Sequence, residues 1–325
     1  MPTRKSPRKG SLQFWPRKRA KKFLPRVSWN IIPETSQIES KNLKGFIGYK
    51  VGMISVYAKD NTSDSMTKGK RIAIPSTIIE CPPMKIFSVR FHKNGKVVKE
   101  FISENIDKEL KKKVKLPKHN KKISEEIKNL KLEDYDDLKV ILYSIVKKTG
   151  IKKKPDLSEV GLQGSLKEKL NFVLENLGKE ISVSNVFTQG ELVDFRGLTR
   201  GRGLSGPVKR FGITLKSHKS EKGRRRPGSL GPWHPARVTF RAPQAGQLGM
   251  FTRIVYNSKI ILMGKIDGES GKEFSNIKNY GNIKTEYIIV KGSVQGPSKR
   301  QLLITSPLRE TRKTGKRNYE FLELR

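Results

Sequence analysis

The stretch LKGFIGYKVGMISVY, residues 43–57, sets the fold class of this chain. It is rich in Ile, Val, Phe and Tyr, which favour extended backbone, and its apolar residues follow no helical period. Similar short runs follow it, each bounded by Gly, Pro or Asn: RIAIPSTIIE at 71–80, KIFSVRF at 85–91 and KVVKEF at 96–101. These runs predict β-strands and a mainly β domain.

A second group of such runs lies later in the chain. They are GELVDF at 190–195, FTRIVYN at 251–257, KIILMGKI at 259–266, EYIIVKGSV at 286–294 and RQLLITS at 300–306. Strands and turns with this spacing suit a barrel or a sandwich, and the two groups can close one barrel. We therefore expect a barrel in two parts, residues 43–103 and 242–306, with a further strand within 183–195.

Residues 104–182 differ in composition and predict an inserted α/β subdomain. Apolar residues recur every three or four positions over 166–177, so one face of a helix is apolar there. Ser165 and Glu168 form a capping box before this helix, and Gly178 follows it. The run DLKVILYSIV at 137–146 is typical of a buried strand.

The charge balance indicates the class of partner. The 325 residues include 69 Lys and Arg against 30 Asp and Glu, a formal net charge of +39. Such a charge repels itself in a free protein, whereas a polyphosphate neutralises it and releases condensed counterions. Nucleic acid is therefore the expected partner. A membrane is not, because neither an amphipathic helix nor an apolar span of about 20 residues is found.

The single cysteine, Cys81, predicts a reducing compartment, since it cannot form an internal disulfide. The first residues also lack the apolar stretch of a signal peptide. A cytoplasmic location is expected.

The N-terminal residues 1–42 are interpreted as a basic extension. The first 30 contain ten Lys or Arg, four Pro and no acid, which excludes a core of their own. Phe14, Trp15, Phe23 and Trp29 interleave aromatic rings with these charges, a combination that suits nucleic acid. We expect this segment to order on its partner. Residues 307–325 are interpreted as a basic C-terminal tail.

Residues 196–241 are interpreted as a central basic arm that penetrates folded RNA. They contain thirteen Lys or Arg, one acid (Glu221) and many glycines, and they follow neither a helical nor a strand period. Glycine permits close backbone approach, and arginine both forks onto phosphates and stacks on bases. By contrast, no arginine occurs between Phe91 and Phe195, so the insertion is expected to face solvent or to make peripheral contacts.

Catalytic and metal chemistry are not expected. GRGLSG at 201–206 fits a dinucleotide-binding pattern, but PVKRFG follows it instead of an apolar-patterned helix. Cys81 and the scattered histidines do not assemble a zinc spacing, and no acidic pair or nucleophile stands out. We therefore predict no catalytic residue, no metal, no cofactor and no small-molecule substrate.

Several long motifs, in order, resemble ribosomal large-subunit protein three in its archaeal and eukaryotic form, over nearly the whole chain. They are MPTRKSPRKGSLQFWPRKRA at 1–20, GFIGYKVGM at 45–53, VFTQGELVDFRGLTRGRGLSGPVKRFG at 186–212, RRRPGSLGPWHPARV at 224–238 and AGQLGM at 245–250. The resemblance implies a non-enzymatic protein that binds large-subunit rRNA early in assembly and contacts neighbouring ribosomal proteins.

The resemblance also implies an architecture. A six-stranded barrel, like that of translation factors, would sit on the subunit surface, while the arm and the N-terminal extension reach toward the peptidyl transferase centre. Trp233 would be the tryptophan finger of the family, and Gln247 belongs to its barrel-return motif. A basic architectural protein acting on DNA is the alternative, although no recognition helix or zipper is found. An RNA-modifying enzyme is a third, less favoured possibility.

From charge, aromatic character and resemblance together, we predict a set of residues that bind rRNA. They are Arg4, Lys5, Arg8, Trp15, Arg17, Arg19, Arg26, Trp29, Arg200, Arg202, Lys209, Arg210, Lys216, His218, Lys219, Lys222, Arg224, Arg225, Arg226, Trp233, His234, Arg237, Arg241 and Gln247.

Overall fold

The computed structural model describes residues 7, 9–34, 42–117, 132–219, 222–266 and 274–324. By its internal contacts the chain divides into two compact units. We call residues 24–197 with 254–325 the body, and residues 1–23 with 198–253 the basic unit.

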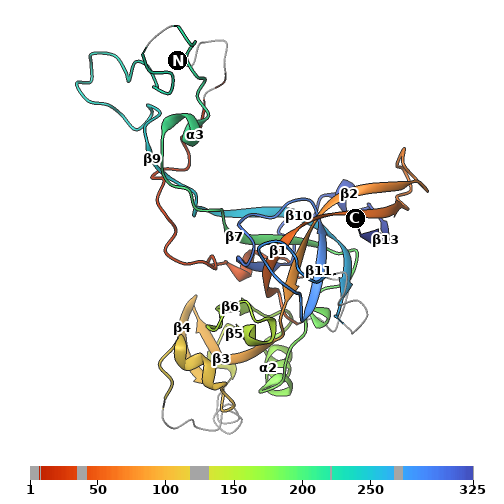
Figure 1. Ribbon diagram of the computed structural model, residues 1–325. Coiled ribbons are helices and arrows are strands. Elements are labelled where there is room, and N and C mark those ends of the chain that lie inside the picture. The colour runs from red at the N-terminus through yellow and green to blue at the C-terminus, as the bar shows by residue number, and fades with distance from the viewer. Residues whose placement is uncertain are drawn as a thin grey trace. The chain divides into compact units, whose positions relative to one another are not determined.

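The body is mainly β, as the sequence predicts, and its larger sheet has seven strands (Figure 1). They are β1 (Gly45–Asp60), β2 (Arg71–Cys81), β7 (Leu192–Leu198), β10 (Thr252–Gly264), β11 (Glu286–Lys291), β12 (Gln301–Thr305) and β13 (Tyr319–Leu324). Their order is β12-β7-β10-β11-β2-β1-β13, and β12 also pairs with β1. The runs at 251–257 and 259–266 form one long strand, β10, rather than two.

Strand β1 supplies the central part of this sheet. It pairs with β2 from Tyr49 opposite Glu80 to Lys59 opposite Arg71. Its first seven residues are all buried, which explains why the apolar run at its start is nearly continuous instead of alternating. Gly48 is needed within this run, because a Cβ there would lie 2.7 Å from the side chain of Ile79.

A second, four-stranded sheet has the order β4-β3-β5-β6. Its strands are β3 (Met84–Lys93), β4 (Lys96–Ile102), β5 (Asp137–Ser144) and β6 (Leu157–Gly161). This corrects the assignment of 85–101 to the barrel, since β3 pairs with β4 on one side and with β5 on the other, and neither β3 nor β4 pairs with the larger sheet. Periodicity identifies a strand but not its partner, so the sequence misplaced these two.

The predicted helix is confirmed as α2 (Leu166–Asn176), which packs beside β5 (Figure 1). Its capping box is complete: the Ser165 hydroxyl accepts from the Glu168 amide, and the Glu168 carboxylate accepts from the Ser165 amide. Gly178 adopts a φ of +75° just beyond the helix, as the C-terminal signal predicts. The buried strand predicted at 137–146 is β5.

The interpretation of 307–325 as a tail is only partly right, because this segment contains regular structure. The short helix α4 (Arg312–Gly315) is followed by β13, which pairs antiparallel with β1 over Val56–Asp60. The alternating apolar residues in YEFLEL predict a strand, but the segment was interpreted from its net basic charge instead.

The body also contains single turns of 3-10 helix. They are η1 (Trp29–Ile31), η2 (Lys108–Lys112), η3 (Leu132–Asp134), η4 (Val146–Thr149) and η5 (Val183–Asn185). None of the described helices is both long and apolar enough to cross a membrane.

The largest core of the body joins both sheets. Its buried residues come from β1, β2 and β12 as well as from β3, β5 and β6. Between the sheets, the hydroxyl of the buried Tyr49 on β1 donates to Asp156 at 2.6 Å and lies 2.7 Å from Ser144 Oγ. The sheets therefore share one apolar interior, in which the Tyr49 hydroxyl is satisfied by hydrogen bonds.

Candidate nucleic-acid interface

The positive charge is distributed unequally between the two units. The basic unit contains 22 Lys and Arg and a single acid, Glu221, whereas the body contains 47 Lys and Arg and 29 Asp and Glu. Among the described residues of the basic unit, only Leu198 and Phe211 are buried hydrophobics. This unit therefore lacks the apolar core that holds the body together, and other interactions must organise it.

A short β-ladder begins that organisation. β8 (Gly203–Ser205) pairs antiparallel with β9 (Gly246–Leu248), and the Arg202 amide donates to the Leu248 carbonyl at 3.0 Å. Gly249 follows with a φ of +78°, and a Cβ there would lie 2.0 Å from the carbonyl oxygen of Arg200. Only glycine fits this close approach, which explains the second glycine of AGQLGM.

A one-turn helix, α3 (Pro207–Phe211), follows β8, so the sequence stretch 196–241 is less irregular than predicted. Gly206 is its N-cap, Pro207 takes the first helical position and Gly212 ends it in the left-handed conformation. A helix therefore does follow GRGLSG, although none was expected from PVKRFG. A dinucleotide-binding site is still not indicated, because β8 lies in an antiparallel pair and not in a parallel βαβ unit.

Two of the arginines predicted to bind RNA also hold the basic unit together. Arg210 donates to three carbonyls, those of Gln247 (3.1 Å), Gln244 (2.9 Å) and Ala245 (3.4 Å), and burial lowers its pKa. Arg17 donates to the carbonyls of Arg210 (3.3 Å) and Ser11 (3.2 Å) and lies 4.3 Å over the Phe211 ring. Guanidinium–carbonyl hydrogen bonds therefore replace part of the missing core.

Gln247 has a similar internal role. Its side-chain amide donates to the carbonyls of Leu248 and Gly249, each at 3.1 Å. These bonds fix the turn that contains Gly249. A structural role therefore accounts for this residue of the return motif.

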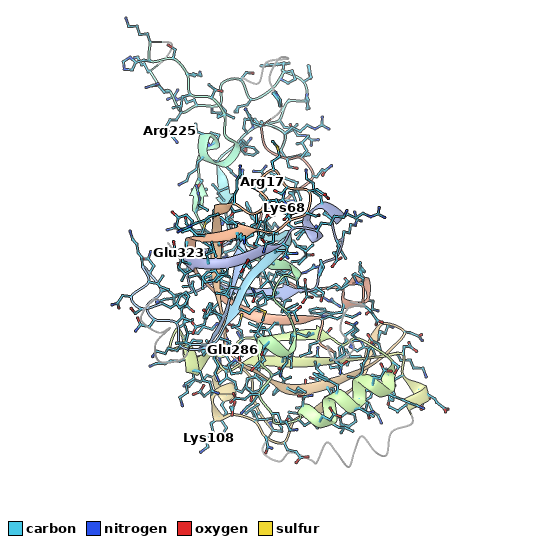
Figure 2. All side chains as sticks on the ribbon, turned by 90° about the vertical axis from the view of Figure 1, so that its right-hand side faces the viewer. Arg17, Lys68, Lys108, Arg225, Glu286 and Glu323 are labelled. Carbon is cyan, nitrogen blue, oxygen red and sulfur yellow. The ribbon has the colours of Figure 1, made fainter. Side chains whose placement is uncertain are left out.

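The remaining predicted residues differ in exposure. Lys216 is partly buried. The exposed residues are Trp15, Arg19, Arg26, Arg200, Arg202, Lys209, His218, Lys219, Lys222, Arg224, Arg225, Arg226, Trp233, His234, Arg237 and Arg241. Figure 2 labels Arg17 and Arg225 among the side chains of the basic unit. Arg26 belongs to the body by its contacts. Arg4, Lys5 and Arg8 lie outside the described residues.

The prediction for Trp29 requires correction. This ring is 3% exposed within the body core, and a Cβ added at Gly45 or Gly161 would lie within 2.8 Å of it. It is therefore not available to stack on a base. The basic run ends at Arg26, and the buried Val27, Trp29 and Ile32 follow it, which is the signal that separates the two roles.

Trp233 has the opposite environment. It is 86% exposed between Pro232 and Pro235, the highest exposure of any aromatic ring among the described residues. Its ring is therefore accessible, unlike that of Trp29.

The basic unit contains further aromatic and cationic residues that are not in the set predicted to bind rRNA. Phe240 packs on Trp15 with ring centroids 5.1 Å apart. The Arg253 guanidinium lies 4.8 Å over the Phe14 ring and 5.4 Å over the Phe251 ring. Phe14 was noted as an interleaved ring, but no sequence signal paired it with a residue more than 200 positions away.

These features define a class of protein: a folded β body that carries a polycationic, core-poor unit with exposed aromatic rings, suited to a polyanion. The chain matches the family model of ribosomal protein L3 over residues 1–324 and belongs to that family.

Similar curated relatives include the large ribosomal subunit protein uL3 of Archaeoglobus fulgidus, 39% identical over 93% of this chain and 92% of the relative. The protein of the same name from Methanobrevibacter smithii is 38% identical over 95% of this chain and 93% of its own. That from Methanosphaera stadtmanae is 39% identical, with coverage of 94% and 93%.

Proposed function

We propose that this chain is a structural, non-enzymatic protein of the large ribosomal subunit that binds rRNA through its basic unit. It works bound to ribosomes in the cytoplasm and contacts neighbouring ribosomal proteins. The observation that carries the proposal is the charge of the basic unit, 22 cations against one acid without an apolar core, in a chain that belongs to the L3 family along its length. Such a unit gains stability when phosphates neutralise it.

The proposal extends to the exposed residues of the predicted set. Arg200, Arg202 and the run Arg224–Arg226 would contact phosphates, because exposed guanidinium groups fork onto phosphate oxygens. Trp233 would pack against bases or backbone deep in the particle, with the arm directed toward the peptidyl transferase centre as in the resembling family. Early binding by this unit would nucleate assembly.

The architecture of the body is proposed to be a six-stranded barrel, with β13 added outside the ring. In support, β12 pairs both with β7 and with β1, so the order β12-β7-β10-β11-β2-β1 returns to its first strand. The insertion 104–182 would remain peripheral, since it carries lysines but no arginine.

A DNA-binding architectural role is less well supported. The longest described helix, α2, has eleven residues, and its buried Val173 is part of the body core. It is therefore not a free recognition helix of the kind that enters a major groove.

Three experiments test the proposal. A tagged chain expressed in cells should co-sediment with the large subunit, and its absence from that fraction would refute the ribosomal role. Crosslinks to rRNA should be dense from residues 196–241 and sparse from 104–182.

The placement of Trp233 is tested in assembled ribosomes. Ribosomes with Trp233→Ala should assemble but show impaired peptidyl transfer or tRNA binding, and unaltered activity would contradict the placement of Trp233.

A further inference from the structure

A cavity of about 800 Å³ lies entirely within the basic unit. This volume falls in the range of roughly 300–1,000 Å³ typical of sites for small ligands. Three aromatic rings line the cavity, Phe14, Trp15 and Phe251, together with six cationic side chains. None of the described residues that line it is acidic. A ligand that is both aromatic and anionic would complement this lining.

The walls of the cavity are held by backbone hydrogen bonds between segments distant in sequence. The Ala20 amide donates to the Met250 carbonyl at 2.9 Å, and the Thr199 amide donates to the Phe251 carbonyl at 2.9 Å. The Arg202 amide bonds to Leu248 across the start of the β8–β9 ladder. The cavity is therefore built by the fold of the unit and does not depend on flexible surface side chains alone.

The rings in this cavity are held yet remain accessible. Trp15 packs on Phe240 and is still 46% exposed, while Phe14 lies under the Arg253 guanidinium and is 59% exposed. Exposed rings fixed in place are the arrangement that stacks on unpaired bases, and each stacking contact tolerates any base because every base has a π-face. Arg200, Arg202 and Lys209 in the same lining provide the charge for the linked phosphates.

We propose that this cavity holds one unstacked nucleotide of the RNA strand, with the base against Trp15 and Phe14 and the phosphate toward Arg200 and Arg202. The proposal rests on the proposed function, since it specifies which part of an RNA strand the basic unit binds: a single unstacked nucleotide. Under this proposal, the cations and the rings contribute differently to binding. The cations provide affinity for any phosphate chain, and the rings provide a preference for chains that carry bases.

The test uses the full chain with Trp233→Phe, which leaves Trp15 as the exposed tryptophan because Trp29 is buried. Octauridylate and an abasic ribose-phosphate chain of the same length are titrated at the same salt concentration, with tryptophan fluorescence as the readout. We expect octauridylate to bind about 5-fold to 150-fold more tightly than the abasic chain and to quench Trp15. Equal affinities would overturn the proposal and indicate an attraction for phosphate alone.

Variants locate the effect. Phe14→Ala and Trp15→Ala should each reduce the ratio of the two affinities, measured by filter binding because Trp15→Ala removes the fluorescent reporter. The use of two variants guards against a disturbed Trp15–Phe240 contact. Arg200→Gln with Arg202→Gln should weaken both oligomers and leave the ratio unchanged. Tyr256→Ala removes an exposed ring of the body and is the matched control. An unchanged ratio in both Phe14→Ala and Trp15→Ala would place the base elsewhere and overturn the proposal.

The chemistry of the occupant is tested separately. Polyglutamate carries negative charge without bases, and binding as tight as that of octauridylate would favour an acidic peptide and overturn the nucleotide assignment. Each of these outcomes is independent of co-sedimentation with the large subunit. Failure of the cavity proposal is therefore distinguishable from failure of the proposed function.

Discussion

Trp29 in the body is 3% exposed and contacts glycines of two strands, whereas Trp233 in the basic unit is 86% exposed between two prolines. The same contrast holds for arginine. In the body, Arg90 pairs with Glu100 at 3.1 Å and with Glu159 at 2.9 Å, while in the basic unit Arg17 and Arg210 donate to backbone carbonyls. The body thus folds through apolar burial and has acids that pair with many of its cations, whereas the basic unit is held by hydrogen bonds that leave its charge uncompensated.

The largest expected effect comes from exchanging the two tryptophans for alanine. Trp29→Ala should lower the free energy of unfolding by about 3–5 kcal/mol, because it leaves a cavity in the core that joins both sheets. Trp233→Ala should change it by less than about 0.5 kcal/mol, as exposed substitutions do. Thermal unfolding measures both. Similar losses for the two variants would remove the distinction between the units.

The second effect concerns the charge contrast. Replacing Arg224, Arg225 and Arg226 with Gln should reduce the affinity for large-subunit rRNA roughly tenfold or more and lower the slope of log K against log salt by about 2–3. The matched control replaces Lys111, Lys112 and Lys113, which are equally exposed in the insertion. Filter binding across salt concentrations measures the slope, and equal slopes for both triple variants would contradict an interface confined to the basic unit.

A smaller effect is expected at Gly249. An alanine there would take the left-handed conformation at a cost of about 1–2 kcal/mol and would also collide with the Arg200 carbonyl. Limited proteolysis within residues 198–253 should accelerate, with the thermal unfolding of the body little changed. Gly206→Ala is the control, since nothing lies within 4 Å of its Cβ position. Equal protease resistance of Gly249→Ala and the wild type would argue against this close approach.

The smallest effect is a pH dependence that belongs to the body alone. Burial by itself raises the pKa of Asp60, but hydrogen bonds from Thr62, Thr67 and Ser65 outweigh burial and lower it. A lowered pKa means that stability is present above the ordinary carboxyl range, near pH 4, and is lost as the pH falls below it. Asp60→Asn should flatten this decline in unfolding experiments between pH 5 and pH 3. A decline as steep as in the wild type would exclude Asp60 as its source.

The sequence predicted much of the body because its strands are short apolar runs between turn residues. The runs that became β1, β2, β7, β10, β11 and β12 were all identified, as was α2 with both of its terminal signals. The pairing of β3 and β4 with the second sheet was not, because two strands with the same pattern can pair with any edge that buries the same face. β13 was missed since a net basic segment was read by its charge.

The candidate interface was predictable in composition but not in geometry. Arginine, glycine and interleaved rings located the basic unit, yet their counts cannot distinguish Arg210, which donates to three carbonyls, from Arg225, which is exposed. The cavity could not be predicted from the sequence for a related reason. Phe14 and Phe251 are distant in sequence, and they line one cavity only because backbone hydrogen bonds join their segments, such as the bond from the Ala20 amide to the Met250 carbonyl.

The strands β7 and β10 are neighbours in the sheet, and residues 199–251 are the connection between them. These residues form a long loop between two paired strands, and because the entropy of closing a loop rises only slowly with its length, a long connection costs the sheet little stability. The length of this connection can therefore change at little cost in free energy, provided that the two flanking strands keep their register.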